Sequence, residues 1–447
     1  MKRAINLIRL AGLPLSLTLI TILAGSVINR VMVVELGLPV TLASLFIAIP
    51  LLVAPVRIWL GYLSDAYPLW GRRREPYLIL GALLSGVGAA AAVILVLNTT
   101  ELLSIGAVAT LVTLIVYGVG RNLANNTFQA LLADMFAPGA PRSRAANLYE
   151  VVKMIGLIIG AGLVSQALRP YSAERLTAVV LVIGGLVVVF SIIAALGQEP
   201  RNEVTRQAAA AARSVPFWPT FKTLLWNDPT ARLFFVIVTI TLLGTQMQDV
   251  LLEPYAGLVF GLDVSATTQL TMFWGIGTLI SILLSGIILI KWLGLLRLFR
   301  VGIVILLVLF PMLVLAGAWQ NVLMLQLTVL GLGLGTGLSA ASLLAYMVQF
   351  TTLKRAGLMV GVWGVGHQLG RALASLIGGV LVDGMKWVTG GDYLVAYGTA
   401  FMLEALLLLV SLVLIGRLHI ENAEALQQEQ REARPVASAQ PAQPVLG

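Results

Sequence analysis

Long apolar runs are the feature that most constrains what this chain can fold into. The stretch LTAVVLVIGGLVVVFSIIAALG (176–197) contains no charged residue, and comparable runs recur along almost the whole sequence. A helix needs about 20 predominantly apolar residues to cross the hydrocarbon core of a bilayer. Charged residues make up only 11% of the chain, whereas soluble domains carry roughly 25%. The sequence therefore predicts an all-α, multi-pass membrane protein.

The apolar runs fall into two groups of six on either side of a basic, polar stretch. The predicted spans are 10–34, 40–63, 77–97, 102–131, 148–168, 176–196, 232–256, 267–290, 297–318, 321–350, 357–383 and 393–416. We therefore expect four regions, namely an N-terminal six-helix half (1–197), a cytoplasmic linker (198–231), a C-terminal six-helix half (232–418) and a tail (419–447). The tail has too little apolar content to fold alone, so we expect it to be disordered after at most a short helical extension.

The placement of Lys and Arg predicts the orientation in the membrane. Most of the 29 basic residues lie in alternate connecting segments or at the two termini, and only Arg169, Arg175 and Lys386 lie in segments on the opposite side. Basic residues accumulate in cytoplasmic loops. Both termini are therefore expected in the cytoplasm. The same placement explains the net charge of +9 without a nucleic-acid partner.

An internal repeat relates the two groups of spans. LLADM (131–135) is followed by Arg144-Ala145, and LLAYM (343–347) is followed by Arg355-Ala356. Both copies come at the end of the fourth span of their group. Parallel six-helix halves joined by a long central loop are the architecture of the major facilitators. We therefore predict a major facilitator fold with twelve transmembrane helices in two pseudo-symmetric halves.

No pattern of an enzyme is visible in the sequence. The chain has no cysteine, which excludes disulfides, thiolate metal sites and thiol nucleophiles. Its two histidines lie far apart in the sequence, and there is neither a Ser/His/Asp arrangement nor a nucleotide-binding loop. We therefore expect a protein that is not an enzyme and that requires no cofactor.

The loop between the second and third spans, GYLSDAYPLWGRRREP (61–76), resembles the major facilitator loop motif. That motif combines a Gly-x-x-x-Asp with a following Gly-Arg-Arg run. An Asp beside a helix end can pair with these arginines, which can also bind neighbouring helix C-termini. One interpretation is a gating latch, and the other is a set of basic residues that only anchor the topology. The candidate latch residues are Gly61, Asp65, Gly71, Arg72, Arg73 and Arg74.

Two further spans carry polar side chains where hydrocarbon is expected. Arg121, Asn122 and Asn125 belong to a polar stripe in the fourth span, which favours the wall of a cavity. His367 and Arg371 are four residues apart on one face of the eleventh span. They could contact a substrate, act as a proton-sensitive switch or supply an axial ligand to a metal macrocycle. The alternative is an internal pair that only fixes helix packing.

The stretch TQMQDVLLEPYAGLVFG (245–261) places two carboxylates at the end of the seventh span. Gln246, Asp249 and Glu253 share one helix face. The repeat aligns this stretch with Asn29 and Arg30 at the end of the first span. We hypothesise that Arg30 pairs with Asp249 or Glu253 and so closes the outer side. The alternative is that each charged group reaches interfacial water by itself.

Two segments resemble one particular branch of the major facilitators. NRVMVVELGLP (29–39) and MQDVLLEPYAGLVFGLDVSATTQL (247–270) are similar to the corresponding segments of the PucC/LhaA family, the chlorophyll-delivery branch. The resemblance implies a protein of the cell inner membrane or photosynthetic membrane that assists light-harvesting complex assembly. Bacteriochlorophyll or chlorophyll would be its cargo. The His367-Gln368 pair departs from the family pattern, and His367 would be a candidate ligand to the pigment magnesium on its own chemistry. Antenna polypeptides or pigment-synthesis enzymes would be its partners.

Two other functions remain open on the sequence alone. The loop motif also resembles that of cation-coupled sugar transporters, and Asp249, Glu253 or Glu404 could then carry a proton for uptake of a small soluble solute. The third possibility is a chaperone that binds antenna subunits laterally and transports nothing.

Overall fold

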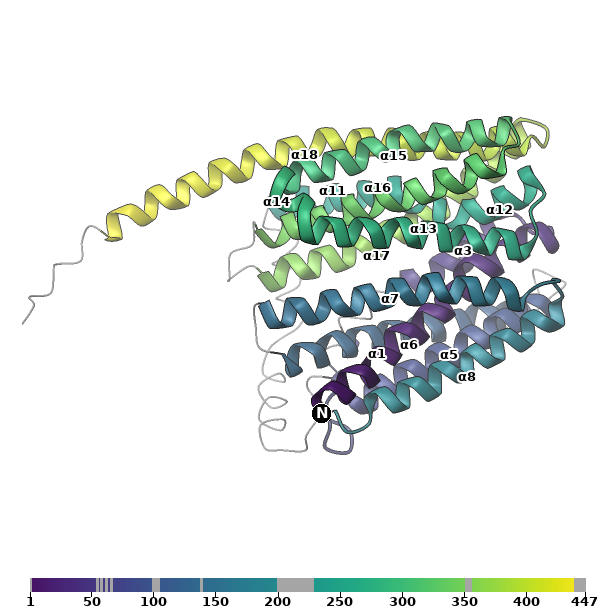
Figure 1. The fold of residues 1–447 in the computed structure, drawn as a ribbon, viewed down its shortest axis with the longest axis horizontal. Helices are drawn as coiled ribbons and strands as arrows, with labels where there is room; N and C mark the ends of the chain where they lie inside the picture. Colours follow the sequence, from purple (N-terminus) through teal and green to yellow (C-terminus); the bar gives the residue numbers. More distant parts are fainter. Residues whose placement is uncertain are drawn as a thin grey trace, which may run out of the picture.

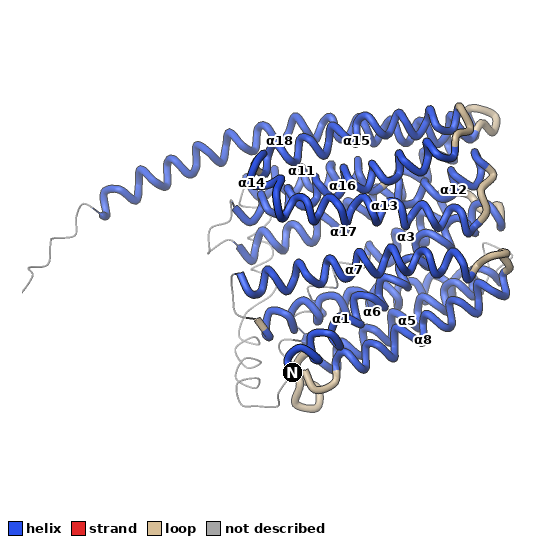
Figure 2. The backbone as a smooth tube through the Cα atoms, viewed as in Figure 1, coloured by secondary structure: helices blue, strands red, loops and turns tan. Residues whose placement is uncertain are grey.

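The computed structural model is a bundle of long helices whose axes run in broadly the same direction (Figure 1). The structure describes residues 2–53, 56, 59–60, 63–64, 67–98, 105–136, 140–198, 229–349 and 356–437. Within those ranges all regular structure is helical, apart from one isolated bridge between Leu69 and Arg72 (Figure 2).

The first span is interrupted by two π-helical turns, while the other described elements of the N-terminal half are plain helices. The span consists of α1 (Lys2–Ile22), η1 (Leu23–Val27), α2 (Ile28–Arg30) and η2 (Val31–Glu35). The remaining helices of this half are α3 (Val40–Leu52), α5 (Glu75–Asn98), α6 (Ile105–Met135), α7 (Ala140–Ala167) and α8 (Ala173–Ala195).

In the C-terminal half the first span is broken near its middle. It consists of α11 (Pro229–Gln246) and α12 (Gln248–Phe260). The elements that follow are α13 (Val264–Leu284), η3 (Ser285–Leu289), α14 (Ile290–Leu293), α15 (Leu295–Ala318), α16 (Val322–Gln349), α17 (Ala356–Val388) and α18 (Tyr393–Ala437).

The described helices agree with the predicted spans. Ten of them are long and apolar enough to cross a membrane, and they coincide with ten of the predicted positions. The other two predicted spans, 40–63 and 357–383, correspond to the shorter apolar helix α3 and to α17. Most of the predicted linker, residues 199–228, lies outside the described residues.

The tail differs from the expectation, because α18 continues as one helix to Ala437. We expected disorder after residue 418 with only a short helical extension. The segment IENAEALQQEQREAR (420–434) contains neither Gly nor Pro and consists mainly of strong helix formers. Low apolar content therefore did not prevent the terminal span from extending as a helix.

The same pairs of spans pack together in the two halves. α5 packs against α6 and α8, as α15 packs against α16 and α18. α1 packs against α7 and α8, as α11 packs against α17 and α18. A shift of six spans thus carries one set of contacts onto the other, which is the pseudo-symmetry that the repeat predicted.

The halves meet through two crossed pairs, α3 with α17 and α7 with α13 (Figure 1). Gly379 of α17 faces Ser44 and the backbone oxygen of Val40 on α3, and a Cβ at this glycine would collide with the serine. Ala48, Leu51 and Ala372 continue this contact as a small apolar cluster. Small residues therefore let the two backbones approach closely.

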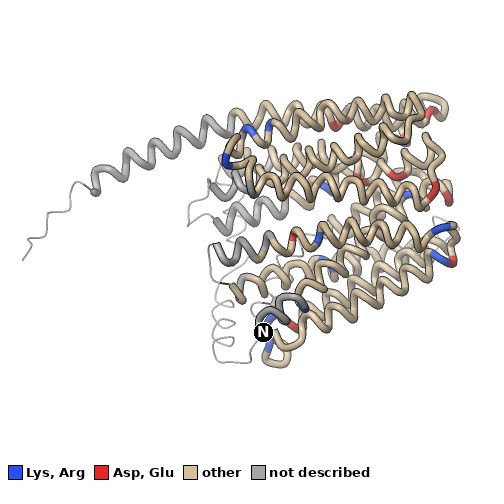
Figure 3. The backbone as a smooth tube through the Cα atoms, viewed as in Figure 1, with Lys and Arg blue, Asp and Glu red and all other residues tan. Residues whose placement is uncertain are grey.

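The charged residues lie mostly at the two ends of the bundle, with a few inside it (Figure 3). We call the end that holds Glu35, Gly261 and Val388 the outer end, following the predicted orientation; it lies at the right in Figure 1. The charged residues inside the bundle define the candidate site.

Candidate functional site

The break in the seventh span is held from α18. Glu404 is fully buried, and its Oε1 accepts a hydrogen bond from the backbone N–H of Gln248, the first residue of α12 (2.9 Å). Val250 N–H donates to the Met247 carbonyl three residues back (3.2 Å), which tightens the turn. The break sets the direction in which the polar side chains of α12 point.

Asp249 and Arg371 form an ion pair next to this break. Nη2 of Arg371 on α17 donates to Oδ2 of Asp249 at 3.1 Å. The side chain of Arg371 is 24% exposed and that of Asp249 is 30% exposed, so the pair borders an accessible space inside the bundle. Gln246 lies one turn before Asp249, His367 lies one turn before Arg371, and both are half-buried. The structure therefore brings together two of the predicted stretches.

α6 of the N-terminal half presents a third charged group to this pair. Arg121 lies close enough to Arg371 for its charge to act on that guanidinium. The Arg121 guanidinium itself has no hydrogen bond or ion pair with the described part of the chain. We call Arg121, Asp249 and Arg371 the central charged cluster.

Asn122, one of the three asparagines of α6, differs from the prediction for the polar stripe. Asn122 is buried, and its Nδ2 donates to the Gly118 carbonyl of its own helix (2.8 Å). Asn125 is half-buried and donates in the same way to the Arg121 carbonyl (3.0 Å). Such bonds within one helix are typical of polar side chains in spans. Asn122 is therefore a packing residue, while Arg121 and Asn125 keep an accessible position.

Glu253 has quite different surroundings, although it lies only one turn beyond Asp249. It is 4% exposed, and its Oε1 accepts a hydrogen bond from Thr271 Oγ1 on α13 (2.8 Å). The same hydroxyl lies 2.9 Å from Ser26 Oγ in the first span. Glu253 therefore ends a chain of polar contacts that crosses between the halves.

Asn29 meets α12 at a position that a proline creates. Pro254 has no N–H, so it cannot donate to the carbonyl four residues earlier in the helix, that of Val250. Nδ2 of the fully buried Asn29 donates to this carbonyl at 2.5 Å. The amide of one half thus supplies the hydrogen bond that the proline of the other half removes.

The hypothesis that Arg30 pairs with Asp249 or Glu253 is wrong. Arg30 Nη1 instead forms an ion pair with Glu35, and Nη2 donates to the Leu262 carbonyl just beyond α12 (2.7 Å). Residues 31–35 form a π-helical turn, which brings residue i+5 next to residue i. We had assumed α-helical spacing, in which Glu35 would not face Arg30.

Gly257 explains how closely these two segments approach. A Cβ at this position would lie 2.9 Å from Val34 Cγ2 and 3.3 Å from Arg30 Nε. Tyr171, in the loop before α8, lies beside the Arg30–Glu35 pair. Burial raises the pKa of the Tyr171 phenol, Glu35 raises it further, and Arg30 lowers it.

Asp383 of α17 is a functional residue that the sequence analysis missed. Its carboxylate accepts hydrogen bonds from the backbone N–H groups of Val40 (3.0 Å) and Thr41 (2.7 Å) and from Thr41 Oγ1 (2.6 Å). It thereby caps the N-terminus of α3 from the opposite half. One signal for this cap was present in the sequence. The N-cap residue of α3 is Pro39, which has no side-chain acceptor, so the acceptor for the first N–H groups of the helix must come from elsewhere. A cavity of about 320 Å³ lies beside this contact, between α3, α12, α17 and α18.

A serine pair completes the contacts at the outer end. Ser165 of α7 and Ser265 of α13 lie 2.9 Å apart through their hydroxyls, and Gln269 donates to Ser165 (3.3 Å). We call the outer interface the set of cross-half contacts made by Ser26, Asn29, Arg30, Ser165 and Asp383, together with Glu253, which is linked to Ser26 through Thr271.

Tyr255 fixes α12 on the side away from the outer interface. Its hydroxyl donates to the Leu313 carbonyl of α15 (2.7 Å), and its fully buried ring packs edge-on against Phe401 at 5.2 Å between centroids. α12 is therefore held by aromatic packing within its own half and by hydrogen bonds from the other half.

The predicted gating loop is partly described. Gly71 adopts φ +75°, Arg72 pairs with Glu75, and Arg73 lies in the same turn. Arg74 is buried and donates to Asp134 of α6 (Nε, 3.0 Å) and to Ser64 (Nη1, 3.0 Å). Gly61 and Asp65 lie outside the described residues, so the latch through Asp65 stays a prediction.

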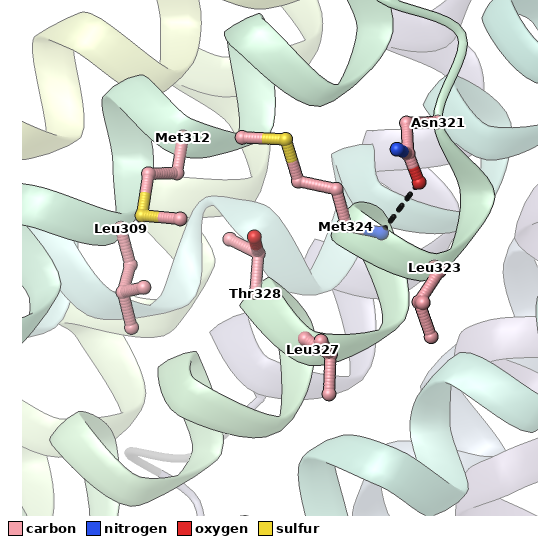
Figure 4. Close-up of a pocket in the computed structure, with 7 residues that line it drawn as sticks. All are labelled: Leu309, Met312, Asn321, Leu323, Met324, Leu327 and Thr328. Atoms are coloured by element: carbon pink, nitrogen blue, oxygen red, sulfur yellow. Dashed lines mark hydrogen bonds between the residues drawn. The ribbon is translucent and has the colours of Figure 1, made fainter.

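A second pocket lies away from the charged cluster, between α15 and α16 near the outer end (Figure 4). Its volume is about 270 Å³, and its lining is mainly Leu and Met. Asn321 Oδ1 accepts a hydrogen bond from the Met324 N–H at its rim (2.9 Å). Leu323 and Leu327 are largely exposed there, as expected of a surface that faces lipid acyl chains.

Comparisons with known proteins agree with this architecture. The profile of the PUCC protein family matches residues 27–423. An uncharacterized protein of the puhA-bchM intergenic region of Rhodobacter capsulatus is 29% identical over 426 residues, covering 92% of this chain and 89% of its own. Protein PucC of Rhodobacter capsulatus is 30% identical over 414 residues, covering 88% and 87%.

A solved structure shows the same fold. A peptide transporter, POT, determined in complex with sulfate, superposes with a TM-score of 0.68 at 14% identity, covering 92% of this chain and 94% of its own. The similarity at this identity concerns the fold alone. The predicted major facilitator fold is therefore confirmed.

Proposed function

The chain belongs to the PUCC protein family, and from that premise we propose that it is a membrane carrier that handles bacteriochlorophyll or chlorophyll for light-harvesting complex assembly. It is a multi-pass protein of the bacterial inner or photosynthetic membrane with the fold of a major facilitator. The observation that carries the proposal is the family match over residues 27–423, nearly the whole length of both halves.

The geometry supports a carrier that works by relative movement of its halves. In this proposal the halves 1–197 and 232–418, joined by the linker 198–231, rock about the central charged cluster. The outer interface closes one side, because its contacts hold α12, α13 and α17 against the other half. A polar pigment head would enter from the opposite end and reach Asp249 and Arg371.

His367 is the candidate axial ligand to the pigment magnesium. It lies on α17 one turn before Arg371 and is half-buried. Among the described residues, no group of three His, Asp or Glu side chains could hold a metal ion. A magnesium that arrives inside a macrocycle needs only one further ligand from the protein, so this absence does not argue against a pigment. Replacing His367 with Leu should lower pigment occupancy and leave the elution profile unchanged.

The experiment that tests the proposal is purification from two hosts, one that makes the pigment and one that does not. We expect the absorption spectrum of protein from the first host to contain bound pigment at a fixed ratio to protein. Protein without pigment from that host, combined with uptake of a soluble solute into pigment-free vesicles, would reject it. Antenna polypeptides that co-purify without pigment would instead identify a non-transporting chaperone.

A coupled solute transporter is the second candidate, favoured by one specific observation. Glu253 and Glu404 are carboxyl groups buried in spans, and each has one oxygen without a hydrogen-bond partner among the described residues. Ionisable groups at such depth often belong to proton pathways. Uptake that depends on a pH gradient, and that is lost in both Glu253→Gln and Glu404→Gln, would support this function.

A further inference from the structure

The two arginines of the central charged cluster come from opposite halves and outnumber its carboxylate. Arg371 of α17 pairs with Asp249, and Arg121 of α6 lies within electrostatic reach of the same guanidinium. Charged side chains inside a membrane protein generally have a partner or line a ligand path. The cluster therefore has one positive charge that Asp249 does not balance.

Both arginines keep hydrogen-bond donors for a ligand. A guanidinium offers five N–H donors in a planar fork. Arg371 uses Nη2 for its one hydrogen bond to Asp249, and Arg121 uses no donor within the described residues. In contrast, Arg30 and Arg74 are buried, and each donates to two partners. The two cluster arginines differ from these structural arginines by their greater exposure and by the smaller number of hydrogen bonds that they make among the described residues.

The neighbouring carboxyl groups do not take up these donors. Glu404 and Glu253 lie within electrostatic reach of Asp249, but both are buried. Each directs an oxygen to another group, Glu404 to the Gln248 N–H and Glu253 to Thr271. Tyr117, one turn before Arg121, is buried and lies within electrostatic reach of Arg371. The accessible charges at the cluster are therefore those of Asp249 and the two arginines, with one positive charge in excess.

We propose that Arg121 and Arg371 together bind the carboxylate of an organic anion, one arginine from each half. The planar fork of arginine matches a carboxylate, and charge-assisted bonds of this type are strong. A ligand held by both halves links its binding to their relative position. The inference rests on the proposed function in one respect, since the expected ligand is the tetrapyrrole of the pigment before esterification, which has a free carboxyl group that bacteriochlorophyll and chlorophyll lack. An ester of the same tetrapyrrole lacks that charge and should bind more weakly.

The test measures the affinity of the full-length protein for an acid and its ester. The protein is placed in nanodiscs of zwitterionic lipid and titrated with bacteriochlorophyllide or its methyl ester, with fluorescence of its nine Trp residues as the signal. We expect the acid to bind at least about tenfold more tightly than the ester. Arg121→Gln and Arg371→Gln should each weaken acid binding by about tenfold to a hundredfold and leave ester binding unchanged.

Two further variants distinguish a specific loss of the binding site from a general loss of the fold. Arg121→Lys keeps the charge but not the fork, so it should retain part of the preference for the acid. Lys153→Gln is the matched control, because it removes a cation of α7 whose partner is Glu150. It should change neither affinity. An acid preference of undiminished size in both glutamine variants would overturn the proposal, as would equal binding of acid and ester to the unmodified protein.

A pigment-free pair of probes separates this inference from the proposed function. Pyrenebutanoic acid and its methyl ester are titrated in the same way. If neither tetrapyrrole binds but pyrenebutanoic acid does so through Arg121 and Arg371, the pigment function fails and the carboxylate site stands. If both tetrapyrroles bind equally well, the pigment function stands and the carboxylate site fails. Competition by phosphatidylglycerol vesicles, without acid preference for either probe, would assign the arginines to a lipid phosphate and reject the site.

Discussion

Asp249 and Glu253 belong to the same short stretch of α12, yet one lies in the central charged cluster and the other in the outer interface. Asp249 is partly exposed and pairs with an arginine of its own half. Glu253 is buried and reaches the opposite half through Thr271 and Ser26. Four residues of helix span only about 6 Å along the axis. The boundary between the accessible space and the closed contact between the halves therefore lies within one helical turn.

Depth along α12, and not residue type, separates the two roles. The two carboxylates share a helix face, so a pattern of spacing treats them alike. Their neighbours differ because the halves converge toward the outer end, where α3, α12 and the first span meet. Substitutions at the outer interface should thus change stability and closure, and substitutions in the cluster should change ligand binding.

The largest effect is expected for Arg30→Ala. The change removes the donor to the Leu262 carbonyl and leaves Glu35 without its partner. We expect the free energy of unfolding to fall by about 2–4 kcal/mol. This is less than for a fully buried ion pair, because Glu35 is partly exposed. Tryptophan fluorescence, followed during unfolding in mixed micelles, measures this change in the free energy of unfolding. Arg175→Ala is the control, since Arg175 donates only within its own turn to Arg169 and Pro170. Equal destabilisation by both substitutions would contradict the assignment of Arg30.

The next effect is expected for Asp383→Ala, which removes the cap of α3. We expect a loss of about 1–2 kcal/mol and a separation of the halves at the outer end. Because the chain has no cysteine, spin labels can be placed at Glu174→Cys and Val388→Cys without removing native thiols. Double electron–electron resonance should then detect a population at longer distance.

Asp392→Ala is the matched control for Asp383→Ala. Asp392 accepts a hydrogen bond from the Val395 N–H and caps α18 within the C-terminal half (3.0 Å). Its removal should lower stability by a similar amount and leave the distance between the labels unchanged. A longer distance in this control as well would show that the separation reports general loosening rather than loss of a contact between the halves.

A smaller effect is expected for Thr271→Val. The substitution keeps the volume of the side chain and removes the hydroxyl between Glu253 and Ser26. We expect a loss of about 1 kcal/mol, with the same spin-label pair shifting slightly toward longer distance. Thr268→Val provides the comparison, because Thr268 donates to Val264 within its own helix. If Thr268→Val opens the outer end as much as Thr271→Val, the polar chain is not part of the closure.

The smallest effect on stability is expected for Asp249→Asn. The ion pair with Arg371 is partly exposed, so its loss should change the free energy of unfolding by less than about 1 kcal/mol. The affinity for an anionic ligand should increase, since the substitution frees an Arg371 donor and increases the positive charge of the cluster. Titration with bacteriochlorophyllide should show affinity that is a few-fold higher. Weaker binding would mean that Asp249 itself holds the ligand.

Much of the fold followed from the sequence, because apolar length and Lys/Arg placement act locally. The stretches 29–39 and 247–270 were also identified, through the resemblance. Their contacts were not, since Arg30 meets Glu35 only through a π-helical turn that spacing does not reveal. Asp383 was missed because it caps a helix more than 300 residues away in the sequence. Pro254 predicts an unpaired Val250 carbonyl, but not that Asn29 supplies the donor.

The first span and α12 are fitted to each other through one hydrogen bond, which Pro254 removes from its own helix and Asn29 replaces. A double-mutant cycle of Asn29→Ala and Pro254→Ala tests it, with the free energy of unfolding as the measured quantity. Pro254→Ala restores an N–H for the Val250 carbonyl, so Asn29 should then matter less. We predict that Asn29→Ala is about 1 kcal/mol less destabilising in the Pro254→Ala background than in the unmodified protein. Additive effects of the two substitutions would contradict the claim.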